Sequence, residues 1–174
     1  LSGAKTVLTP VTSHTPEPQP VQVTRIERTS AESMDQAKEI LREASSVIIV
    51  PGYGMALAKA QFQVADLSRR LMATGKQVSF AIHPVAGRMP GHMNVLLAEA
   101  DVDYELLREM DDVNDEFKST DVVLVIGACD VVNPAAIRKS DTPISGMPIL
   151  NAHEAKHTLV FNLDERPGYS GVPN

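Results

Sequence analysis

A glycine-rich stretch at residues 52–57, GYGMAL, has the residue types that bind phosphate groups through the backbone. Gly52 and Gly54 stand two positions apart, and such a pair allows a tight turn in which backbone N–H groups approach a pyrophosphate. A helix that starts directly behind the turn adds partial positive charge. Leu57 departs from the dinucleotide-binding pattern, which has Gly or Ala there, and a plain strand-to-helix turn is the alternative interpretation. The candidates for cofactor binding are Gly52, Tyr53, Gly54, Met55 and Ala56.

A second candidate loop covers residues 83–92, HPVAGRMPGH. Two prolines and two glycines within ten residues predict a shaped, rigid loop. Arg88 lies at its centre, where a guanidinium can hold a phosphate through two hydrogen bonds, although an exposed Arg on a structural turn is the alternative. His83 and His92 have no Cys or acidic partner at metal-ligand spacing, so we interpret them as surface or capping residues and predict no metal site. The candidates here are Val85, Ala86, Gly87, Arg88, Met89 and Pro90.

The third candidate loop, residues 127–134, reads GACDVVNP. Gly127 permits close approach of a ligand, and Asp130 lies just beyond the preceding apolar run, where it can meet a polar edge of the ligand. We interpret Cys129 as a small packed residue, because no basic group stands near it. No Ser-His-Asp order and no paired carboxylates stand out, so we predict no catalytic side chain and assign the chemistry to a cofactor. The candidates here are Gly127, Ala128, Cys129, Asp130 and Val131.

Each of these loops follows an apolar run that predicts a strand, at residues 47–50, 78–82 and 122–126. Such runs, without polar alternation, suit strands buried on both faces of a parallel sheet. Further strands are predicted at 148–150 and 158–161. Because ligands of open α/β sheets bind beyond the carboxyl ends of the strands, the three loops are expected to share one site.

Helices are predicted between these strands. A capping-box pattern at residues 29–32 precedes a helix whose apolar face is Met34, Ala37, Leu41 and Ala44. A second helix follows Gly54 and ends at Gly75, and its apolar positions are Ala60, Val64, Leu67 and Leu71. Two more are predicted at 92–100 and 111–119. This alternation predicts an α/β fold, a Rossmann-like open parallel sheet with helices on both faces.

The second predicted strand ends in Ile82-His83-Pro84, without an acidic residue. An ordinary NAD site has Asp or Glu there to bind the adenosine ribose, roughly twenty residues after the glycines. We therefore expect the adenosine ribose not to be held in the usual manner.

The composition excludes several classes of protein. The chain has 174 residues, a length typical of one domain, and a net charge of −6 with 16 Lys and Arg. No basic block is present, which argues against nucleic acid or an anionic membrane as the main partner. A single cysteine, Cys129, excludes an internal disulfide framework. No apolar run reaches the roughly 18–20 residues of a membrane helix, and residues 1–20 do not resemble a secretory signal, so we expect a soluble, intracellular domain.

Residues 1–28 differ in composition from the rest. Pro10, Pro16, Pro18 and Pro20 alternate with Thr, Ser and Gln, so neither a helix nor a central strand is expected. We predict a flexible linker or extended arm over 1–28, with a disordered tail or expression remnant as the alternative, and a folded nucleotide-binding domain over 29–174.

The three loops together resemble a known family. The stretches 50–56, 83–100 (HPVAGRMPGHMNVLLAEA), 127–130, 133–135 and 146–148 resemble the NADP(H)-binding domain of proton-translocating nicotinamide nucleotide transhydrogenase. The resemblance covers roughly residues 47–151 and then weakens.

The resemblance implies a Rossmann-like domain that projects from a membrane proton channel of an inner-membrane complex, facing the cytoplasm or mitochondrial matrix. It implies that NADP(H) is held in a reversed orientation, which accounts for the missing acidic residue. A separate NAD(H)-binding component docks against the domain, hydride passes directly between the two nicotinamides, and the domain is active only with that partner.

Residue roles also follow from the resemblance. Gly52, Tyr53 and Gly54 would lie over the dinucleotide, and residues 85–90 would border its pyrophosphate and nicotinamide, with Arg88 near phosphate. Residues 127–131 would lie near the nicotinamide and its ribose, and Asp130 would couple nucleotide state to proton movement. The family's remaining motifs are matched by Gly146, Met147, Gly168 and Tyr169, of which the last two match its lid.

The chain also departs from the family pattern. Cys129 stands where the family has Asn. The family's Lys-Arg-Ser, whose basic pair holds the 2′-phosphate, is replaced by a segment in which only Arg166 is basic, beside Asp164 and Glu165. A carboxylate at ~4 Å from a phosphate charge costs up to about 4 kcal/mol at an effective dielectric of 20. The family also continues past the position of Asn174, through another nucleotide-contacting segment and a final helix.

We predict NADP(H) as the cofactor, with Arg166 among its ligands. One alternative is a non-catalytic or degenerate nucleotide-binding module with altered cofactor preference. Another is a stand-alone enzyme acting on a small molecule, which would need an internal nucleophile or base.

Overall fold

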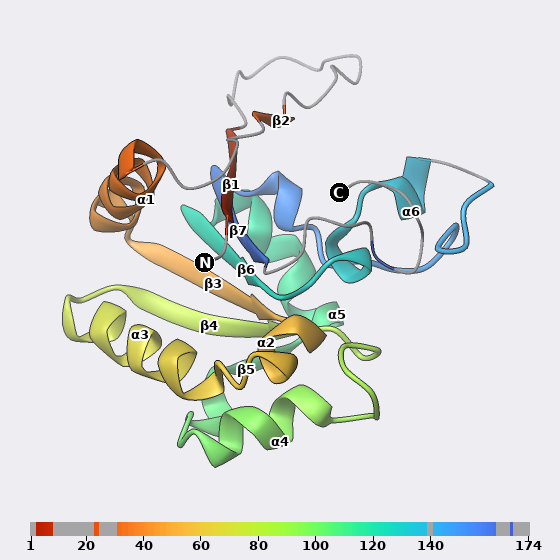
Figure 1. The fold of residues 1–174 in the computed structure, drawn as a ribbon, viewed down its shortest axis with the longest axis horizontal. Coiled ribbons are helices and arrows are strands. Elements are labelled where there is room, and N and C mark those ends of the chain that lie inside the picture. Colours follow the sequence, from red (N-terminus) through yellow and green to blue (C-terminus); the bar gives the residue numbers. More distant parts are fainter. Residues whose placement is uncertain (1–2, 9–22, 25–30, 139–140, 163–167, 169–174) are drawn as a thin grey trace.

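The apolar runs of the sequence form the strands of one sheet in the computed structural model, which describes residues 3–8, 23–24, 31–138, 141–162 and 168. Within these residues the sheet has seven strands in the order β2-β1-β7-β6-β3-β4-β5 (Figure 1). Its strands are β1 (Gly3–Leu8), β2 (Val23–Thr24), β3 (Ser46–Pro51), β4 (Gln77–Ile82), β5 (Leu107–Glu109), β6 (Val122–Ile126) and β7 (His157–Asn162).

Helical segments connect the strands in the described part of the chain. The α-helices are α1 (Ala31–Glu43), α2 (Tyr53–Leu57), α3 (Gln61–Ala73), α4 (His92–Glu99), α5 (Met110–Val113) and α6 (Ala135–Arg138). The 3-10 helices are η1 (Tyr104–Leu106), η2 (Asn114–Ser119), η3 (Asp130–Val132) and η4 (Ala152–Glu154). None of the helices in this part of the chain is long and apolar enough to cross a membrane.

The five strands from β7 to β5 are parallel, which confirms the predicted open parallel sheet. From β3 the chain moves outward through β4 to β5, and then returns to form β6 on the other side of β3. The direction in which the chain adds strands to the sheet therefore reverses between β3 and β6. In open α/β sheets this reversal creates the crevice in which ligands bind.

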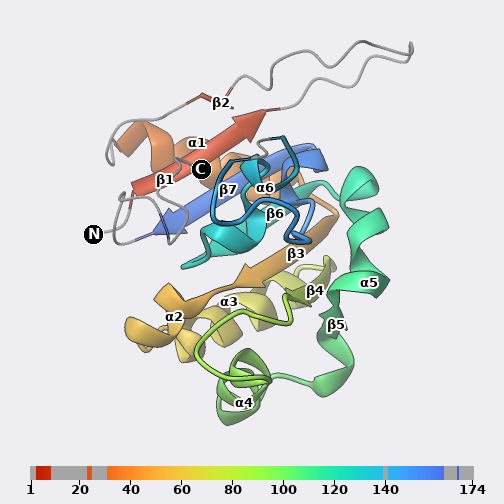
Figure 2. The ribbon, with the colours of Figure 1, turned by 90° about the vertical axis from the view of Figure 1, so that its right-hand side faces the viewer.

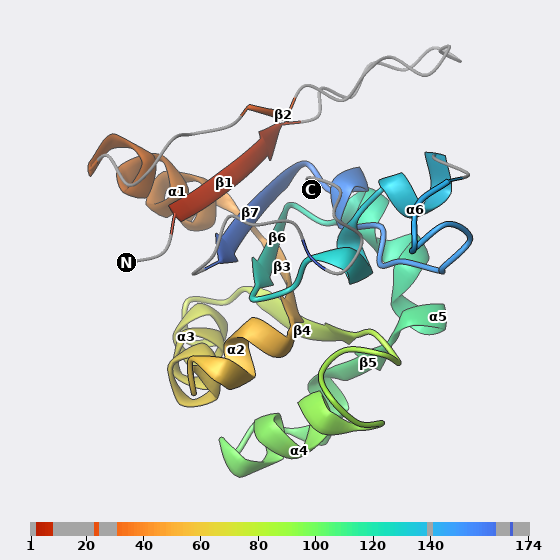
Figure 3. The same cartoon turned by 45° about the vertical axis from the view of Figure 1, so that its right-hand side comes forward.

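Alternate residues of the central strands face opposite layers of the core. On one face Val47, Ile49 and Leu124 pack with α1, α3 and α4, and on the other Ile48 and Val123 pack with α5, η2 and η4. Figures 2 and 3 show α1 and α3 on the side of the sheet opposite α5. The prediction of helices on both faces is confirmed, and the central strands are apolar throughout because both of their faces are covered.

Some predicted elements differ in the structure. The helix predicted after Gly54 is two helices, α2 and α3, because Lys59 between them has a positive φ of 51°. The helix predicted at 111–119 is the short α5 followed by the 3-10 helix η2. Gly75, predicted to end α3, has a φ of +84°, which confirms that role. On the apolar face predicted for the first helix, Ala37 and Ala44, which directly follows α1, are buried, whereas Met34 is exposed.

The strand predicted at 148–150 is absent, since this described segment makes no ladder. Ile149 and Leu150 are buried because they pack into the core, and their backbone is held by loops and side chains. Leu150 N donates to Val131 O at 2.9 Å, and Asn114 Nδ2 donates to Ile149 O at 2.9 Å. The apolar composition of this segment is consistent with its burial, but the prediction of a strand was wrong.

Two strands, β1 and β2, lie within residues 1–28, for which a flexible linker or extended arm with neither a helix nor a central strand was predicted. β1 pairs antiparallel with β7, from Gly3 opposite Asn162 to Leu8 opposite His157. The edge of β7 offers unpaired backbone groups to any extended segment, so this pairing needs no particular side-chain pattern. The four prolines lie outside both strands, Thr29 and Ser30 of the predicted capping box lie outside the described residues, and the boundary at residue 28 stays a prediction.

A carboxylate joins the strands at the end of the sheet opposite the candidate loops. Asp121 Oδ2 accepts hydrogen bonds from Ser45 N at 2.9 Å and Ser46 N at 3.2 Å, and Lys156 Nζ pairs with its other oxygen. These contacts, led by that with Lys156, lower the pKa of Asp121 to about 2. The paired carboxylate fixes the starts of β3, β6 and β7 relative to one another.

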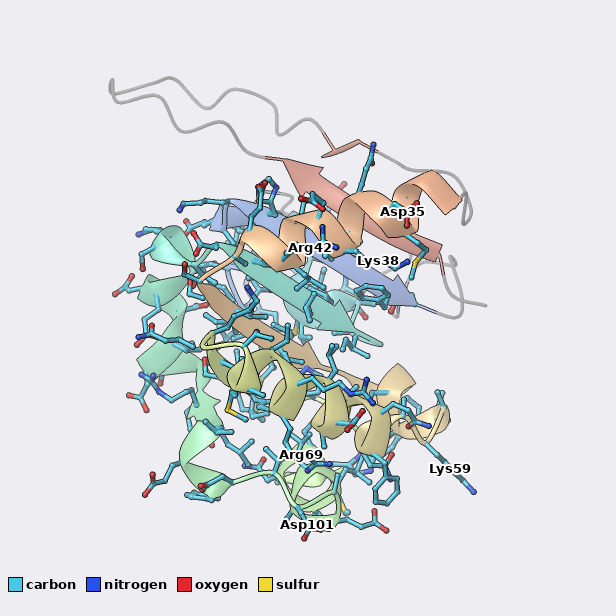
Figure 4. All side chains as sticks on the ribbon, turned by 90° about the vertical axis from the view of Figure 1, so that its left-hand side faces the viewer. Asp35, Lys38, Arg42, Lys59, Arg69 and Asp101 are labelled. Carbon is cyan, nitrogen blue, oxygen red and sulfur yellow. The ribbon has the colours of Figure 1, made fainter. Side chains whose placement is uncertain are left out.

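Helices α3 and α4 are joined at the outer face of the sheet. Arg69 of α3 donates through Nη1 to Ala100 O at the end of α4, at 3.3 Å. Asp101, which follows, has a positive φ of 56° and ends this helix. Figure 4 shows Arg69 above Asp101 and, at the far end of α3, Lys59 extending away from the molecule.

Candidate functional site

The three candidate loops begin at the carboxyl ends of β3, β4 and β6, which are adjacent in the sheet. The loops after β3 and β6 are joined directly through the backbone. Gly52 N donates to Ile126 O and Gly54 N donates to Gly127 O, each at 2.9 Å. All three loops thus lie at the same end of the sheet, and those after β3 and β6 meet where the strand order reverses.

The glycines of these two loops interlock. A Cβ at Gly52 would lie 2.3 Å from Gly127 O, and one at Gly54 would lie 2.8 Å from Gly127 Cα. A Cβ at Gly127 would lie 2.2 Å from Met55 N, and Gly127 also has a φ of +66°. All these distances are below any real Cβ contact, so the loops approach this closely only because the three positions carry no side chain. These glycines were predicted to let a ligand approach the backbone, whereas the atoms nearest to them belong to the facing loop.

The backbone donors of the first loop are largely occupied. Besides the bonds of Gly52 N and Gly54 N, Met55 N donates to Gly52 O at 3.1 Å. Three of the N–H groups expected to face a pyrophosphate are thus satisfied within the protein. The helix behind the loop, α2, has only five residues, so its dipole is smaller than a long helix would supply. These three backbone donors are therefore not available to a ligand.

The second loop supplies a charged side chain. The guanidinium of Arg88 lies over the ring of Tyr53, with its central carbon 4.3 Å from the ring centroid. Arg88 N donates to Nδ1 of His92 at 3.0 Å, and the rings of Tyr53 and His92 are 6.3 Å apart. The side chain of Arg88 is exposed, so an anionic ligand can reach it. No spacing in the sequence pairs Tyr53 with Arg88, and only the adjacency of β3 and β4 brings them together.

His83 is buried and is therefore not a surface residue, although it does cap a backbone N–H, that of Val85. Its Nε2 lies 2.8 Å from Pro148 O, and its Nδ1 accepts from Val85 N at 3.2 Å. Val85 N is a donor and Pro148 O an acceptor, so the ring is neutral with its proton on Nε2. Burial lowers the pKa of His83, and the bond to Pro148 opposes this in part. His83 thereby ties the second loop to the segment that contains Gly146 and Met147.

The other candidates of the second loop are arranged around these two histidines. Ala86 is buried, and Ala86 N donates to His83 O at 3.0 Å. Gly87 has a φ of +94°, and a Cβ there would lie 2.4 Å from Nδ1 of His92. The side chains of Val85, Met89 and Pro90 are exposed. Hydrogen bonds to the two histidines hold the backbone of this loop, while these three side chains lie at the surface.

Asp130 is the central polar group of the third loop. It begins η3, and a Cβ built on Gly168 would lie 2.7 Å from both of its carboxylate oxygens. Asn162, the last residue of β7, donates through Nδ2 to Ala128 O at 3.3 Å. Asn162, at the end of β7, and Gly168 therefore both lie beside this loop. Cys129, the single cysteine of the chain, is half-buried.

Gly146 and Met147 belong to a small separate core rather than to the interlocked loops. Met147 packs against Ala136, Ile144 and Ile149, and Gly146 N donates to Ala136 O at 3.0 Å. This segment is linked to the second loop by Pro148 O, which His83 contacts, and to the third loop by Leu150 N, which donates to Val131 O. Arg166 and Tyr169 lie outside the described residues.

Metal ligands are not brought together in the described ranges. No group of three His, Cys, Asp or Glu side chains there could hold a metal ion. What the loops do offer is one exposed guanidinium, one carboxylate and a closely packed backbone at the switch point. This combination suits an anionic ligand that also carries hydrogen-bond donors.

The strand order, which reverses between β3 and β6, defines an α/β domain of the Rossmann-like class. Comparison with known proteins specifies the family. Residues 5–174 match the family described as NAD(P) transhydrogenase beta subunit. The chain is also 51% identical over 144 residues to NAD(P) transhydrogenase subunit beta of Rhodospirillum rubrum, which covers 83% of this chain. The same subunit from R. rubrum strain ATCC 11170 matches equally. The chain belongs to the NAD(P) transhydrogenase beta subunit family, and the matched region spans 31% of the length of these relatives.

Proposed function

We propose that this chain is the NADP(H)-binding component of a transhydrogenase. It holds NADP(H) for direct hydride transfer from NADH bound on a partner component, and in the whole enzyme this transfer is coupled to proton translocation. The observation that carries the proposal is the direct contact between the loops after β3 and β6 at the switch point, beside the loop after β4, whose Arg88 lies over Tyr53. Membership of the beta subunit family supports it.

The residues at this edge fit a dinucleotide. The exposed guanidinium of Arg88 would hold a phosphate oxygen through paired hydrogen bonds. The carboxylate of Asp130 would accept from a ribose hydroxyl or the nicotinamide carboxamide. The interlocked backbone of Gly52, Gly54 and Gly127 would form the floor between them. In the sequence, Arg166 is the one cation near the end of β7 that could meet a 2′-phosphate.

The nicotinamide ring supplies the hydride chemistry when the dinucleotide is bound. The chain's own residues would bind and orient it, and no side-chain acid or base is required. The rigid loops would fix the ring at the open edge of the sheet, where the NAD(H)-binding component brings its own ring into contact. Fixing two reactants in this way removes much of the entropic cost of their encounter.

The remaining partner would be a membrane-spanning proton-channel component, with this domain on the cytoplasmic or matrix side. Asp130 would report the nucleotide state to that component. Its carboxylate lies against Gly168, so a ligand that moves the segment after β7 would change the surroundings of Asp130 directly.

Calorimetric titration with NADP⁺ and NAD⁺ tests the proposal. A portion of the purified chain is first denatured and assayed for nucleotide retained through purification. Tight NADP⁺ binding with much weaker NAD⁺ binding supports the proposal, and adding an NAD(H)-binding component should then produce hydride transfer. Binding of neither nucleotide would refute it.

A second candidate is a nucleotide-binding module with altered cofactor preference. The acidic pair Asp164-Glu165 beside Arg166 favours it, because carboxylates repel a 2′-phosphate. A preference for NAD⁺ in the same titration would select this candidate. Replacing both acids by Asn and Gln should then shift the preference toward NADP⁺.

A further inference from the structure

Tyr53, Arg88 and His92 form a cluster between the loop after β3 and the loop after β4. Arg88 is exposed, and an exposed arginine side chain ordinarily samples many rotamers, so a ligand that binds it must restrict that motion. Here the guanidinium lies on an aromatic ring, at 4.3 Å from the centroid of Tyr53. A cation held over an aromatic face is attracted by the ring quadrupole.

The backbone of Arg88 is restrained as well. Arg88 N donates to Nδ1 of His92 at 3.0 Å, and the preceding Gly87 has a φ of +94°. A Cβ at Gly87 would lie 2.4 Å from the same Nδ1, so the loop approaches the imidazole as closely as a glycine permits. His92 begins α4, a helix anchored by the buried Met93 and Leu97. The imidazole therefore fixes the loop to a rigid element.

We propose that Tyr53 and His92 are positioning residues that hold the guanidinium of Arg88 where it binds a phosphate of the ligand, the aromatic face fixing the side chain and the imidazole fixing its backbone. This inference rests on the proposed function for the identity of the ligand. It assigns Tyr53 an action through Arg88, whereas the sequence analysis placed Tyr53 over the dinucleotide. The two roles make different predictions for a double-mutant cycle.

The cycle uses Tyr53→Phe, Tyr53→Leu and Arg88→Gln in the 174-residue chain, with NADP⁺ binding measured by calorimetry. Phe keeps the aromatic face, so Tyr53→Phe should bind within about twofold of the original chain. Tyr53→Leu should weaken binding about two- to fivefold, the range for an exposed cation–aromatic contact. Arg88→Gln should weaken binding about tenfold or more, because a charge-assisted contact to phosphate is lost.

The decisive variant combines Tyr53→Leu with Arg88→Gln. If Tyr53 acts through Arg88, the double variant should bind as the single Arg88→Gln variant does. If the double variant is weaker again by the full effect of Tyr53→Leu, Tyr53 contacts the ligand independently and the proposal is overturned.

A spectroscopic readout separates positioning from a loss of folding. The Nε–H proton resonance of Arg88 should be shifted by the ring current of Tyr53 in the ligand-free chain. The shift should persist in Tyr53→Phe and vanish in Tyr53→Leu, while backbone resonances of the sheet stay in place. An unshifted Arg88 resonance in the original chain would refute the inference.

A matched pair of variants tests the role of His92. In His92→Asn the side-chain oxygen can replace Nδ1 as the acceptor for Arg88 N, whereas His92→Leu offers no acceptor. Binding should be retained more fully by Asn than by Leu. Equal losses in the two variants would contradict the backbone role.

Inorganic pyrophosphate serves as a ligand that does not depend on the proposed function. If the chain binds neither NADP⁺ nor NAD⁺, the proposed function fails, and pyrophosphate binding then decides the inference. Dependence of that binding on Arg88 and on the aromatic ring at position 53 supports it, and independence from either overturns it.

Discussion

Replacing Gly127 by Ala should destabilise the protein well beyond the cost of a strained backbone. Gly127 has a φ of +66°, and a left-handed backbone at a residue with a Cβ costs about 1–2 kcal/mol. The new Cβ would also lie 2.2 Å from Met55 N and 2.5 Å from the carbonyl carbon of Gly54. These are backbone atoms, which no rotamer change can move, so the loops must separate at a further cost of about 1–3 kcal/mol.

Gly75→Ala is the matched control. Gly75 has a similar φ of +84°, and a Cβ there would have no atom within 4 Å. It should therefore show only the cost of the left-handed backbone. The free energies of unfolding of both variants are measured by urea denaturation, with coincident fluorescence and circular dichroism transitions as the test of two-state behaviour.

We expect Gly127→Ala to lose about 1–3 kcal/mol more than Gly75→Ala. NADP⁺ binding should fall in the first variant and stay unchanged in the second, because only the first displaces the loops at the switch point. Equal losses of stability in the two variants would show that the loops yield freely, and the interlock would then not define the site.

Three further predictions concern groups away from that interlock. Burial lowers the pKa of His83 below its ordinary value of 6.5, so the free energy of unfolding should be constant above that pH and fall as the pH drops toward the folded-state pKa. Urea denaturation between pH 8 and 5 checks this. If the free energy of unfolding of His83→Gln depended on pH in the same way, the prediction would be contradicted. Asp121, with its pKa lowered to about 2, should contribute about 1–2 kcal/mol that is present above pH ~4 and lost as the pH falls through about 2. Asp121→Asn should remove that acid dependence, and a persistent loss of the same size would assign it to other groups. Leu124 is fully buried in the centre of β6, so Leu124→Ala should cost about 2–5 kcal/mol in thermal or urea unfolding, and a cost under about 1 kcal/mol would show that the core refills the space.

The strands and the class of fold follow from local patterns in the sequence. The run at 122–126 coincides with β6, and those at 47–50 and 78–82 lie within β3 and β4. Both faces of these strands are covered, so their composition is apolar throughout and needs no knowledge of distant residues. Gly75 likewise ends its helix through a conformation that depends on one residue. Such features were predictable because neighbouring residues determine them.

Short edge elements were not predictable in this way. β5 has three residues, none of them buried, and it forms because Phe80 and the residues after it present a free edge. β1 forms on the edge of β7 in the same manner. Conversely, Ile149 and Leu150 are buried in the core without forming a strand. Their backbone groups bond to Asn114 and Val131 instead. Pairing depends on which edge is available, and that depends on the assembled sheet.

The residue types of the site were predictable, whereas their partners were not. The three loops and the exposed Arg88 were identified from composition and spacing alone. Tertiary structure decided that Gly52 faces Gly127, that Arg88 lies on Tyr53, and that His83 is buried against Pro148. Local conformation is determined by interactions among a few neighbouring residues, but these pairs are 35 to 75 positions apart. Only the order of the strands places such distant residues in contact.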